Sequence, residues 1–276
     1  KMSYDNSEML RAYLSAYQAL HTPLLTAVAP GIVDWAIAVM VDRQRSSFAT
    51  SQDADLTFGD DGDYWTWTKE EVGSVLSPQE AAVAARVFDI ADTGEMHHNA
   101  KKNVLWWQQD PSPEGDDEWP VLHTALRKLK EARDRRPAPF VDRTAYVNWN
   151  AMMAGAFLQA GAVLDRPECN TVALTVLERI WSEGWNAKSG MSHVLGRPDP
   201  RGMLDDNVQS AAGFLDAYEA TGDAPWLKLT SAVMRYCGIG RAHARTPVTS
   251  LSRMPSFALK KTNIAPPFIH QHVIPS

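Results

Sequence analysis

Apolar side chains recur along most of the chain at the spacing of an α-helix. Leu10, Tyr13, Leu14 and Tyr17 stand at i, i+3, i+4 and i+7, which predicts a helix in the first segment. Similar stripes predict helices within residues 22–35, 119–129, 150–164, 173–181, 206–218 and 225–237. Signals typical of strands are confined to two short pieces, 46–51 and 64–68.

The segment 150–164 combines this pattern with many alanines and glycines. Small side chains allow neighbouring helices to approach closely. We therefore expect this helix to be buried and tightly packed.

Short links between the helices predict antiparallel hairpins, roughly four of them, and hence an all-α fold. We expect a helical domain in residues 1–240 and an irregular basic tail in residues 241–276. The last 53 residues contain seven Lys or Arg and no Asp or Glu. A basic tail can bind an anionic partner, but a terminus that is disordered or not native is the favoured interpretation.

The composition argues against several classes of protein. The 276 residues carry a net charge of -6, whereas nucleic-acid binding needs a basic face. The apolar runs are far shorter than the ~20 residues of a membrane span. The two cysteines, Cys169 and Cys237, form no CxxC pair, so a reducing, cytoplasmic location is expected. The chain opens on Lys1 without a signal-peptide pattern, so we expect a fragment boundary there.

Polar clusters recur where the predicted helices begin. They are Tyr4-Asp5-Asn6, Ser51-Gln52-Asp53-Ala54-Asp55, Asp142, Asn148-Trp149-Asn150 and Leu204-Asp205-Asp206-Asn207. Helix capping accounts for Asn6, Asn150 and Asp206, because Asp and Asn satisfy the free N–H groups of a helix start. It does not account for two or three polar groups together, often beside an aromatic residue. In a ring of helical hairpins these clusters would converge on one cavity.

Carboxylates meeting in such a cavity suit glycoside hydrolysis. An inverting enzyme holds its two carboxyl groups ~6.5–9.5 Å apart and a retaining enzyme ~5–5.5 Å apart. The candidate catalytic pair is Asp53 or Asp55 facing Asp205 or Asp206. The other residues of the clusters, Tyr4, Asp5, Asn6, Gln52, Asp142, Asn148, Trp149 and Asn150, are candidates for binding the substrate.

Two further residue types support sugar chemistry. Most of the ten tryptophans are expected to fill the core, but Trp65, Trp67 and Trp149 stand beside polar motifs and can stack on sugar rings. His193 precedes the Asp205-Asp206 pair and is a candidate general base for an epimerisation. The competing interpretation of His193 is a polar surface residue.

Motifs for metals and cofactors are absent from the sequence. His97 and His98 are adjacent and lack the spacing of a zinc site. The acidic stretch 53–63 departs from the EF-hand pattern. No G-x-S-x-G, P-loop or G-x-G-x-x-G motif occurs. We therefore expect no metal and no cofactor.

Several motifs occur together in an order that resembles a known family. They are KMSYDNSEMLRAYLSAYQ, TSQDAD followed by YWTWTKEEV, KNVL, VNWNAMM and GMLDDNVQSAAGFLDAYEATGD. Over residues 1–236 the chain resembles the helical domain of the thioredoxin-domain proteins that include the spermatogenesis-associated thioredoxin-like proteins. The resemblance implies an (α/α) toroid of six hairpins, similar to glycosidases and N-acylglucosamine epimerases. It also implies a thioredoxin-like domain ahead of the toroid.

The chain departs from this family in three ways. It has neither a thioredoxin module nor a CxxC pair, and its matching part stops before the last hairpins. The usual tract before the central helix is here Val141-Asp142-Arg143. With about four of six hairpins the ring is expected to stay open, leaving an apolar flank for another chain or a missing segment to cover.

Two functions follow as hypotheses. The first is a carbohydrate-active enzyme, a hydrolase or an epimerase, with a pocket that gathers Asp5, Asp53, Asp55, Asn148, Trp149 and Asp205. The second is a helical scaffold without catalysis that binds a ligand or a protein, or supports a thioredoxin domain. The scaffold predicts that the same polar side chains serve mainly as caps and as partners of one another.

Overall fold

The computed structural model describes residues 1–20, 23–60, 62–109, 118–198 and 200–243. Contacts between Cα atoms divide the chain into a unit Lys1–Gly238 and a unit Ile239–Ser276. Most of the predicted tail, residues 244–276, lies outside the described part.

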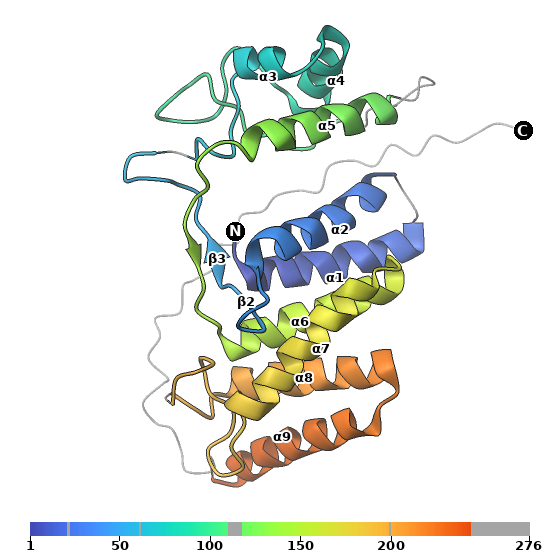
Figure 1. The fold of residues 1–276 in the computed structure, drawn as a ribbon, viewed down its shortest axis with the longest axis vertical. Coiled ribbons are helices and arrows are strands. Elements are labelled where there is room, and N and C mark those ends of the chain that lie inside the picture. Colours follow the sequence, from blue (N-terminus) through green and yellow to red (C-terminus); the bar gives the residue numbers. More distant parts are fainter. Residues whose placement is uncertain (21–22, 61, 110–117, 199, 244–276) are drawn as a thin grey trace, which may run out of the picture. The chain divides into compact units, whose positions relative to one another are not determined.

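The first unit is built mainly of helices (Figure 1). In chain order the described elements are α1 (Ser3–Leu20), α2 (Pro23–Trp35), the π-helical turn η1 (Ala36–Met40), β1 (Val41–Asp42), β2 (Ser47–Phe48), β3 (Ser51–Gln52), α3 (Lys69–Val75), α4 (Pro78–Phe88), α5 (Trp119–Arg133), β4 (Val141–Asp142), α6 (Val147–Val163), α7 (Pro167–Arg179), η2 (Ile180–Gly184), α8 (Leu204–Thr221) and α9 (Ala224–His243), whose last residues belong to the second unit. The strands form two antiparallel pairs, β1 with β2 and β3 with β4. The all-α expectation is confirmed.

The two predicted strand pieces fare differently. The piece 46–51 contains β2 and reaches β3, but the piece 64–68 is not a strand. It forms turns and a single bridge from Trp67 to Asn103, and Thr68 caps the start of α3. Closure of the helices into a toroid stays a prediction.

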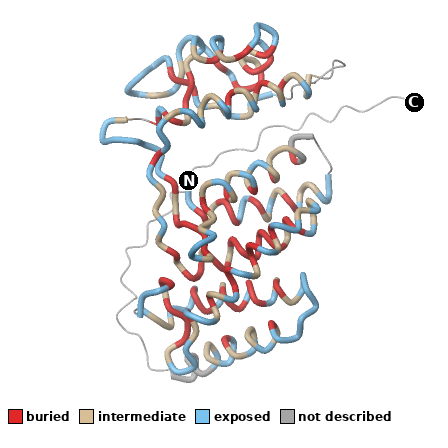
Figure 2. Tube along the Cα trace, viewed as in Figure 1, coloured by how far each residue is buried: buried red, intermediate tan, exposed pale blue. Residues whose placement is uncertain are grey.

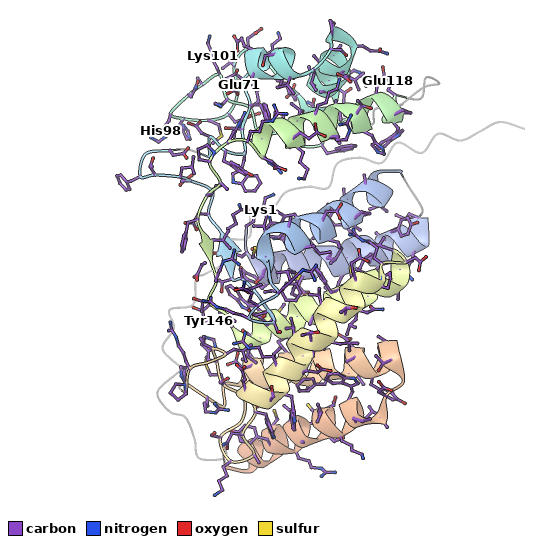
Figure 3. All side chains as sticks on the ribbon, in the orientation of Figure 1. Lys1, Glu71, His98, Lys101, Glu118 and Tyr146 are labelled. Atoms are coloured by element: carbon purple, nitrogen blue, oxygen red, sulfur yellow. The ribbon has the colours of Figure 1, made fainter. Side chains whose placement is uncertain are left out.

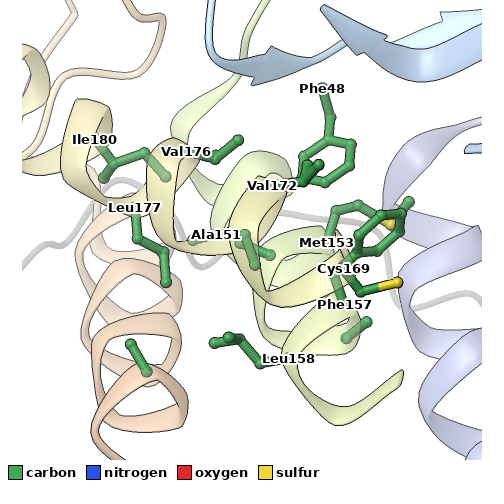
Figure 4. Packing of buried hydrophobic residues seen from close by; sticks show 14 of the residues in the cluster. Phe48, Ala151, Met153, Phe157, Leu158, Cys169, Val172, Val176, Leu177 and Ile180 are labelled. Atoms are coloured by element: carbon green, nitrogen blue, oxygen red, sulfur yellow. The ribbon is translucent and has the colours of Figure 1, made fainter. Parts of the chain in front are cut away.

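Helix α6 lies at the centre of the main core. Most of its residues are buried, and they appear red in Figure 2. Helices α1, α7 and α8 all contact it. On α6, Phe157 meets Phe48 edge to face at 4.9 Å between ring centroids (Figure 4). Cys169 is buried in the same core, and burial raises the pKa of its thiol to about 11, which leaves it unreactive.

Small residues set the spacing of these helices, as their abundance in 150–164 predicts. Above Gly155 of α6, Arg11 of α1 forms an ion pair with Asp216 of α8, at 2.5 Å between Nη2 and Oδ2. A Cβ on Gly155 would lie 2.0 Å from that Arg11 nitrogen and 2.1 Å from that Asp216 oxygen. Because Gly155 has no side chain, the ion pair between α1 and α8 fits over the surface of α6.

A second core lies among α3, α4 and α5. Capping boxes begin two of these helices, Thr68 with Glu71 for α3 and Ser77 with Glu80 for α4. The segments 49–67 and 134–146 connect this core to the main one through the pair β3–β4. Arg136 reinforces the connection, because its guanidinium donates to the carbonyl oxygens of residues 63, 64 and 66.

Replacing Gly213 of α8 by Val should destabilise the main core. A Cβ at Gly213 would lie 3.0 Å from Leu177 Cδ2 and 3.2 Å from the carbonyl oxygen of Ala151 in α6. The added atoms would push α8 away from α6, so we expect the free energy of unfolding in urea to fall by about 1–3 kcal/mol. The matched control is Gly73→Val in α3, where a Cβ meets nothing within 4 Å. Equal losses in both variants would contradict the close packing.

Candidate functional site

Three predicted clusters meet where α1, α6 and α8 begin, because these helices start at the same end of the unit (Figure 1). The rings of Tyr4 and Trp149 lie 4.7 Å apart between centroids. The ring centroid of Tyr146, which is labelled in Figure 3, lies 5.2 Å from that of Trp149 and 4.9 Å from that of His193. We call these four rings the aromatic cluster. It joins residues that are remote in the sequence.

A buried carboxylate adjoins the aromatic cluster. Asp206 in the first turn of α8 has no exposed surface, and its Oδ2 lies 3.0 Å from His193 Nδ1. The backbone N–H of Asn148 in α6 donates to Asp206 Oδ1 at 3.3 Å. Asp206 thus satisfies a free N–H group at the start of a different helix. Burial raises the pKa of Asp206, and the hydrogen bond with His193 opposes that rise.

The loop between η2 and α8 carries His193 and is tied to both neighbouring helices. The carbonyl oxygen of His193 accepts a hydrogen bond from Val147 N at 2.9 Å, where α6 begins. Further along, Asn207 Oδ1 of α8 accepts a hydrogen bond from Met191 N at 3.1 Å. These contacts hold the imidazole in a fixed position beside Tyr146.

The pairing with Asp206 determines what the imidazole of His193 can do. When Nδ1–H donates to the carboxylate, Nε2 keeps its lone pair and can accept a proton. The buried carboxylate then stabilises the imidazolium that forms. The side chain of His193 is 26% exposed, whereas that of Asp206 is 1% exposed. A ligand can therefore reach the histidine but not the aspartate.

The other polar groups of the three helix starts pair with one another. Asn148 Nδ2 donates to Asp205 Oδ2 at 2.5 Å, and Gln209 Nε2 lies 3.4 Å from Asp205 Oδ1. At the start of α1, hydrogen bonding to the Asp5 carboxylate raises the pKa of Tyr4. Several of the amide and hydroxyl groups at this end therefore already form hydrogen bonds with neighbouring carboxylates.

The predicted catalytic residues Asp53 and Asp55 lie on the exposed loop after β3. The backbone N–H of Asp53 donates to the carbonyl oxygen of Phe140 at 2.9 Å. Asp55 Oδ1 accepts a hydrogen bond from Gly62 N at 3.1 Å, which shapes the loop itself. The structure places Asp205 and Asp206 beside the aromatic cluster, whereas the carboxylate of Asp55 bonds within its own loop and Asp53 pairs with Phe140 through its backbone. Their pairing with Asp205 or Asp206 stays a prediction.

Three further predicted binding residues lie in other surroundings. Gln52 is buried in β3, where its Oε1 accepts a hydrogen bond from Trp35 Nε1 at 3.1 Å. Trp67 is buried in the second core with the guanidinium of Arg136 4.0 Å from its ring centroid. Asp142 of β4 accepts a hydrogen bond from a backbone N–H two residues later.

Neither Asn150 nor Asp206 caps the helix in which it lies, although Asp206 accepts from a free N–H group at the start of α6. Both residues lie inside the first turns of α6 and α8, and the N-cap positions carry no side-chain cap. Asn150 instead brackets the backbone of Phe48, accepting from its N–H at 2.7 Å and donating to its carbonyl at 3.1 Å. Asn6 also lies inside its helix, and its side-chain amide donates to the carbonyl oxygen of Met2 at 2.7 Å, as that of Asn150 donates to the carbonyl oxygen of Tyr146 at 2.9 Å.

Sequence reasoning missed Tyr146, which links Trp149 to His193. It stands directly before the VNWN motif, and its backbone pairs with Val194. Its ring spacing relative to Trp149, three residues on, is a signal that the sequence does contain.

The described residues hold no group of three or more His, Cys, Asp or Glu side chains arranged for a metal ion. None of the helices in the described part is long and apolar enough to cross a membrane.

No family model matches the chain. It is similar to spermatogenesis-associated protein 20 of Homo sapiens, with 25% identity over 270 residues that cover 83% of this chain and 34% of the human protein. The rat and mouse proteins of the same name are each 24% identical over the same shares. The chain thus spans about a third of the length of these curated relatives. The resemblance to spermatogenesis-associated proteins is confirmed.

Among solved structures, the chain is similar to a sugar epimerase from a ruminal bacterium. The TM-score is 0.32 and the identity 13%, over 86% of this chain and 75% of that chain. A likeness of this size does not bear on function.

Replacing Asn150 by Ala should lower stability, because Asn150 holds the buried backbone of Phe48. The backbone groups of Phe48 would lose their partners, so we expect a loss of about 1–3 kcal/mol in the free energy of unfolding. Urea unfolding of this variant and of Gln159→Ala, a half-buried amide on the same helix, provides the comparison. A loss no larger than that of the control would rule out the role.

The raised pKa of Asp206 predicts a pH dependence of stability. The folded state keeps this proton at pH values where the unfolded state releases it. The stabilisation is complete below the ordinary carboxyl pKa and is lost as the pH rises through the raised one. Asp206→Asn removes the titration, so the stability of the wild type relative to the variant should fall as the pH rises above the ordinary carboxyl pKa of about 4.

Denaturant unfolding at a series of pH values measures this difference between wild type and Asp206→Asn. The exposed neighbour provides the control variant, Asp205→Asn. A difference that stays level or increases with pH would show that Asp206 is not destabilised by its burial.

Proposed function

We propose that this helical domain binds a sugar at the aromatic cluster and that His193 removes a proton from it, as an epimerisation requires. One observation carries the proposal. The buried Asp206 lies 3.0 Å from Nδ1 of His193, whose ring is partly exposed and lies beside Tyr146.

The proposed chemistry starts from a sugar stacked on the aromatic cluster. Aromatic rings favour the apolar faces of pyranoses, and Tyr4 and Trp149 offer such rings. In the open-chain form of the sugar, Nε2 of His193 takes the proton from the carbon next to the carbonyl. The C–H electron pair forms a C=C bond, and the carbonyl π pair moves to the oxygen. A water molecule then donates a proton to the opposite face of this enolate, which restores the carbonyl and gives the epimer, and the imidazolium passes its proton to the hydroxide that is left. Asp206 stabilises the imidazolium between the two steps.

Glycoside hydrolysis by two carboxylates is the other reaction on the same site. It requires one of Asp205 or Asp206 to act with Asp53 or Asp55. Asp206 is buried and already accepts from His193 and Asn148, which favours the proton transfer through His193. Asp205 is exposed and remains the carboxylate on which hydrolysis would depend.

A scaffold without catalysis is the second candidate function, and specific contacts favour it. Asn148 pairs with Asp205, and Asn150 with the backbone of Phe48, so several predicted site residues hold the structure together. In this version the chain is part of a longer protein of the thioredoxin-domain family and supports its thioredoxin-like domain. Closure of the ring by further hairpins or by a second copy, and a cytoplasmic location, belong to the same proposal.

Incubation with unphosphorylated hexoses and N-acetylhexosamines in D2O tests the proposed proton transfer. We expect deuterium to replace the hydrogen on the carbon next to the carbonyl, and NMR measures this exchange. In His193→Gln the rate should fall by about 10²-fold or more, because the base is lost. His98→Gln, in the exposed loop after α4, should leave the rate unchanged.

Other outcomes distinguish the alternatives. Release of reducing sugar from disaccharides that depends on Asp205 would favour hydrolysis. If no sugar exchanges deuterium, is cleaved or raises the melting temperature, the scaffold is favoured and the catalytic proposal falls.

A further inference from the structure

Four arginines from four separate segments line one hollow of about 400 Å³ in the main unit. Arg45 comes from the β1–β2 turn, Arg143 from the segment after β4, Arg179 from the end of α7 and Arg197 from the loop after η2. We call this the arginine hollow. Its volume lies in the ~300–1,000 Å³ range of small-molecule sites.

Neighbouring carboxylates offset only part of this positive charge. Asp42 lies 3.9 Å from Arg45 and 3.8 Å from Arg143, while Glu183 pairs with Arg179 at 2.9 Å. In the described part of the chain, no carboxylate forms an ion pair with Arg197. Among the described residues, four guanidinium groups thus face two carboxylates, in a chain whose net charge is -6.

The floor of the arginine hollow is ordered by backbone hydrogen bonds and burial. Leu195 N donates to the carbonyl oxygen of Ala145 at 2.9 Å, and both residues belong to the main core. Ser47 of β2 is buried, and Arg179 reaches across to donate to the carbonyl oxygen of Arg45. The arginines therefore project from a packed base, and the contact between Arg179 and Arg45 holds two sides of the hollow together.

The positive charge extends beyond this hollow. A second hollow of about 440 Å³ shares Arg45 and Arg143 and adds Arg43. Ser47 and Thr144 bring hydroxyl groups to the arginine hollow. Guanidinium groups and hydroxyls are the donors that proteins use for phosphate oxygens, because the planar fork of arginine binds two oxygens at once.

We propose that the arginine hollow is a binding site for the phosphoryl group of a small molecule, either a phosphate monoester or free phosphate. An anion with two negative charges suits the excess of guanidinium groups over the carboxylates that the described residues place beside them. The site is separate from the aromatic cluster, although one backbone pairing, Tyr146 with Val194, borders both. It therefore stands whether or not the proposed sugar chemistry holds.

Titration calorimetry at low ionic strength with inorganic phosphate, glucose 6-phosphate and glucose tests the proposal. We expect the two phosphate-bearing probes to bind and glucose not to bind at this hollow. The double variant Arg143→Gln/Arg197→Gln should weaken phosphate binding by about tenfold or more, because it removes two charged donors. Added salt should weaken binding to the wild type, since the arginines are partly exposed.

The control is Arg127→Gln, whose arginine is 62% exposed against 48% for Arg143 and pairs with Glu131 on α5. It should bind phosphate as the wild type does. Tighter binding of glucose 6-phosphate than of phosphate would identify a phosphate monoester as the ligand, and equal binding would identify free phosphate. Absence of phosphate binding, or equal binding by the wild type and the double variant, would overturn the proposal. An equal loss in Arg127→Gln would overturn it too, because it would show binding to the general surface charge.

Discussion

The close approach of α1 and α8 to α6 organises the main core and the helix starts at its edge. Gly155 and the alanines of α6 have side chains too small to hold neighbouring helices apart. The ion pair between Arg11 and Asp216 then joins the two flanking helices across α6. Both residues of that pair are partly shielded from water, where such pairs interact more strongly than on an open surface. Because all three helices begin at one end, this packing also brings Tyr4 against Trp149.

Asp206 shows how that convergence is used. Burying a carboxylate is costly unless donors compensate it. Its two donors, the imidazole of His193 and the backbone N–H of Asn148, come from a loop and from another helix. One buried group therefore fixes the loop to both helix starts, and it presents the opposite edge of the imidazole to a ligand. Stability and candidate chemistry depend here on the same atoms.

Charge is distributed unevenly over this acidic chain. The aspartates of the loop after β3 serve largely as local caps, since Asp60 accepts from the backbone N–H groups of Leu56 and Asp63. The arginines instead contact residues that are remote in the sequence. Arg136 binds the segment before α3, and the arginines of the arginine hollow come from four segments. A net charge of -6 thus conceals a local excess of positive charge.

Periodicity and small side chains act locally, so the sequence alone predicted most of the helices, the buried character of 150–164 and the grouping of polar residues at helix starts, but it did not predict α3 and α4. It also contained the similarity to spermatogenesis-associated proteins. The folded chain was needed to show that His193 pairs with Asp206, that Asn150 supports Phe48, and that Arg45, Arg143, Arg179 and Arg197 share one hollow. These contacts join residues far apart in the chain, and they depend on the distances and rotations at which helices pack, which a local pattern does not encode.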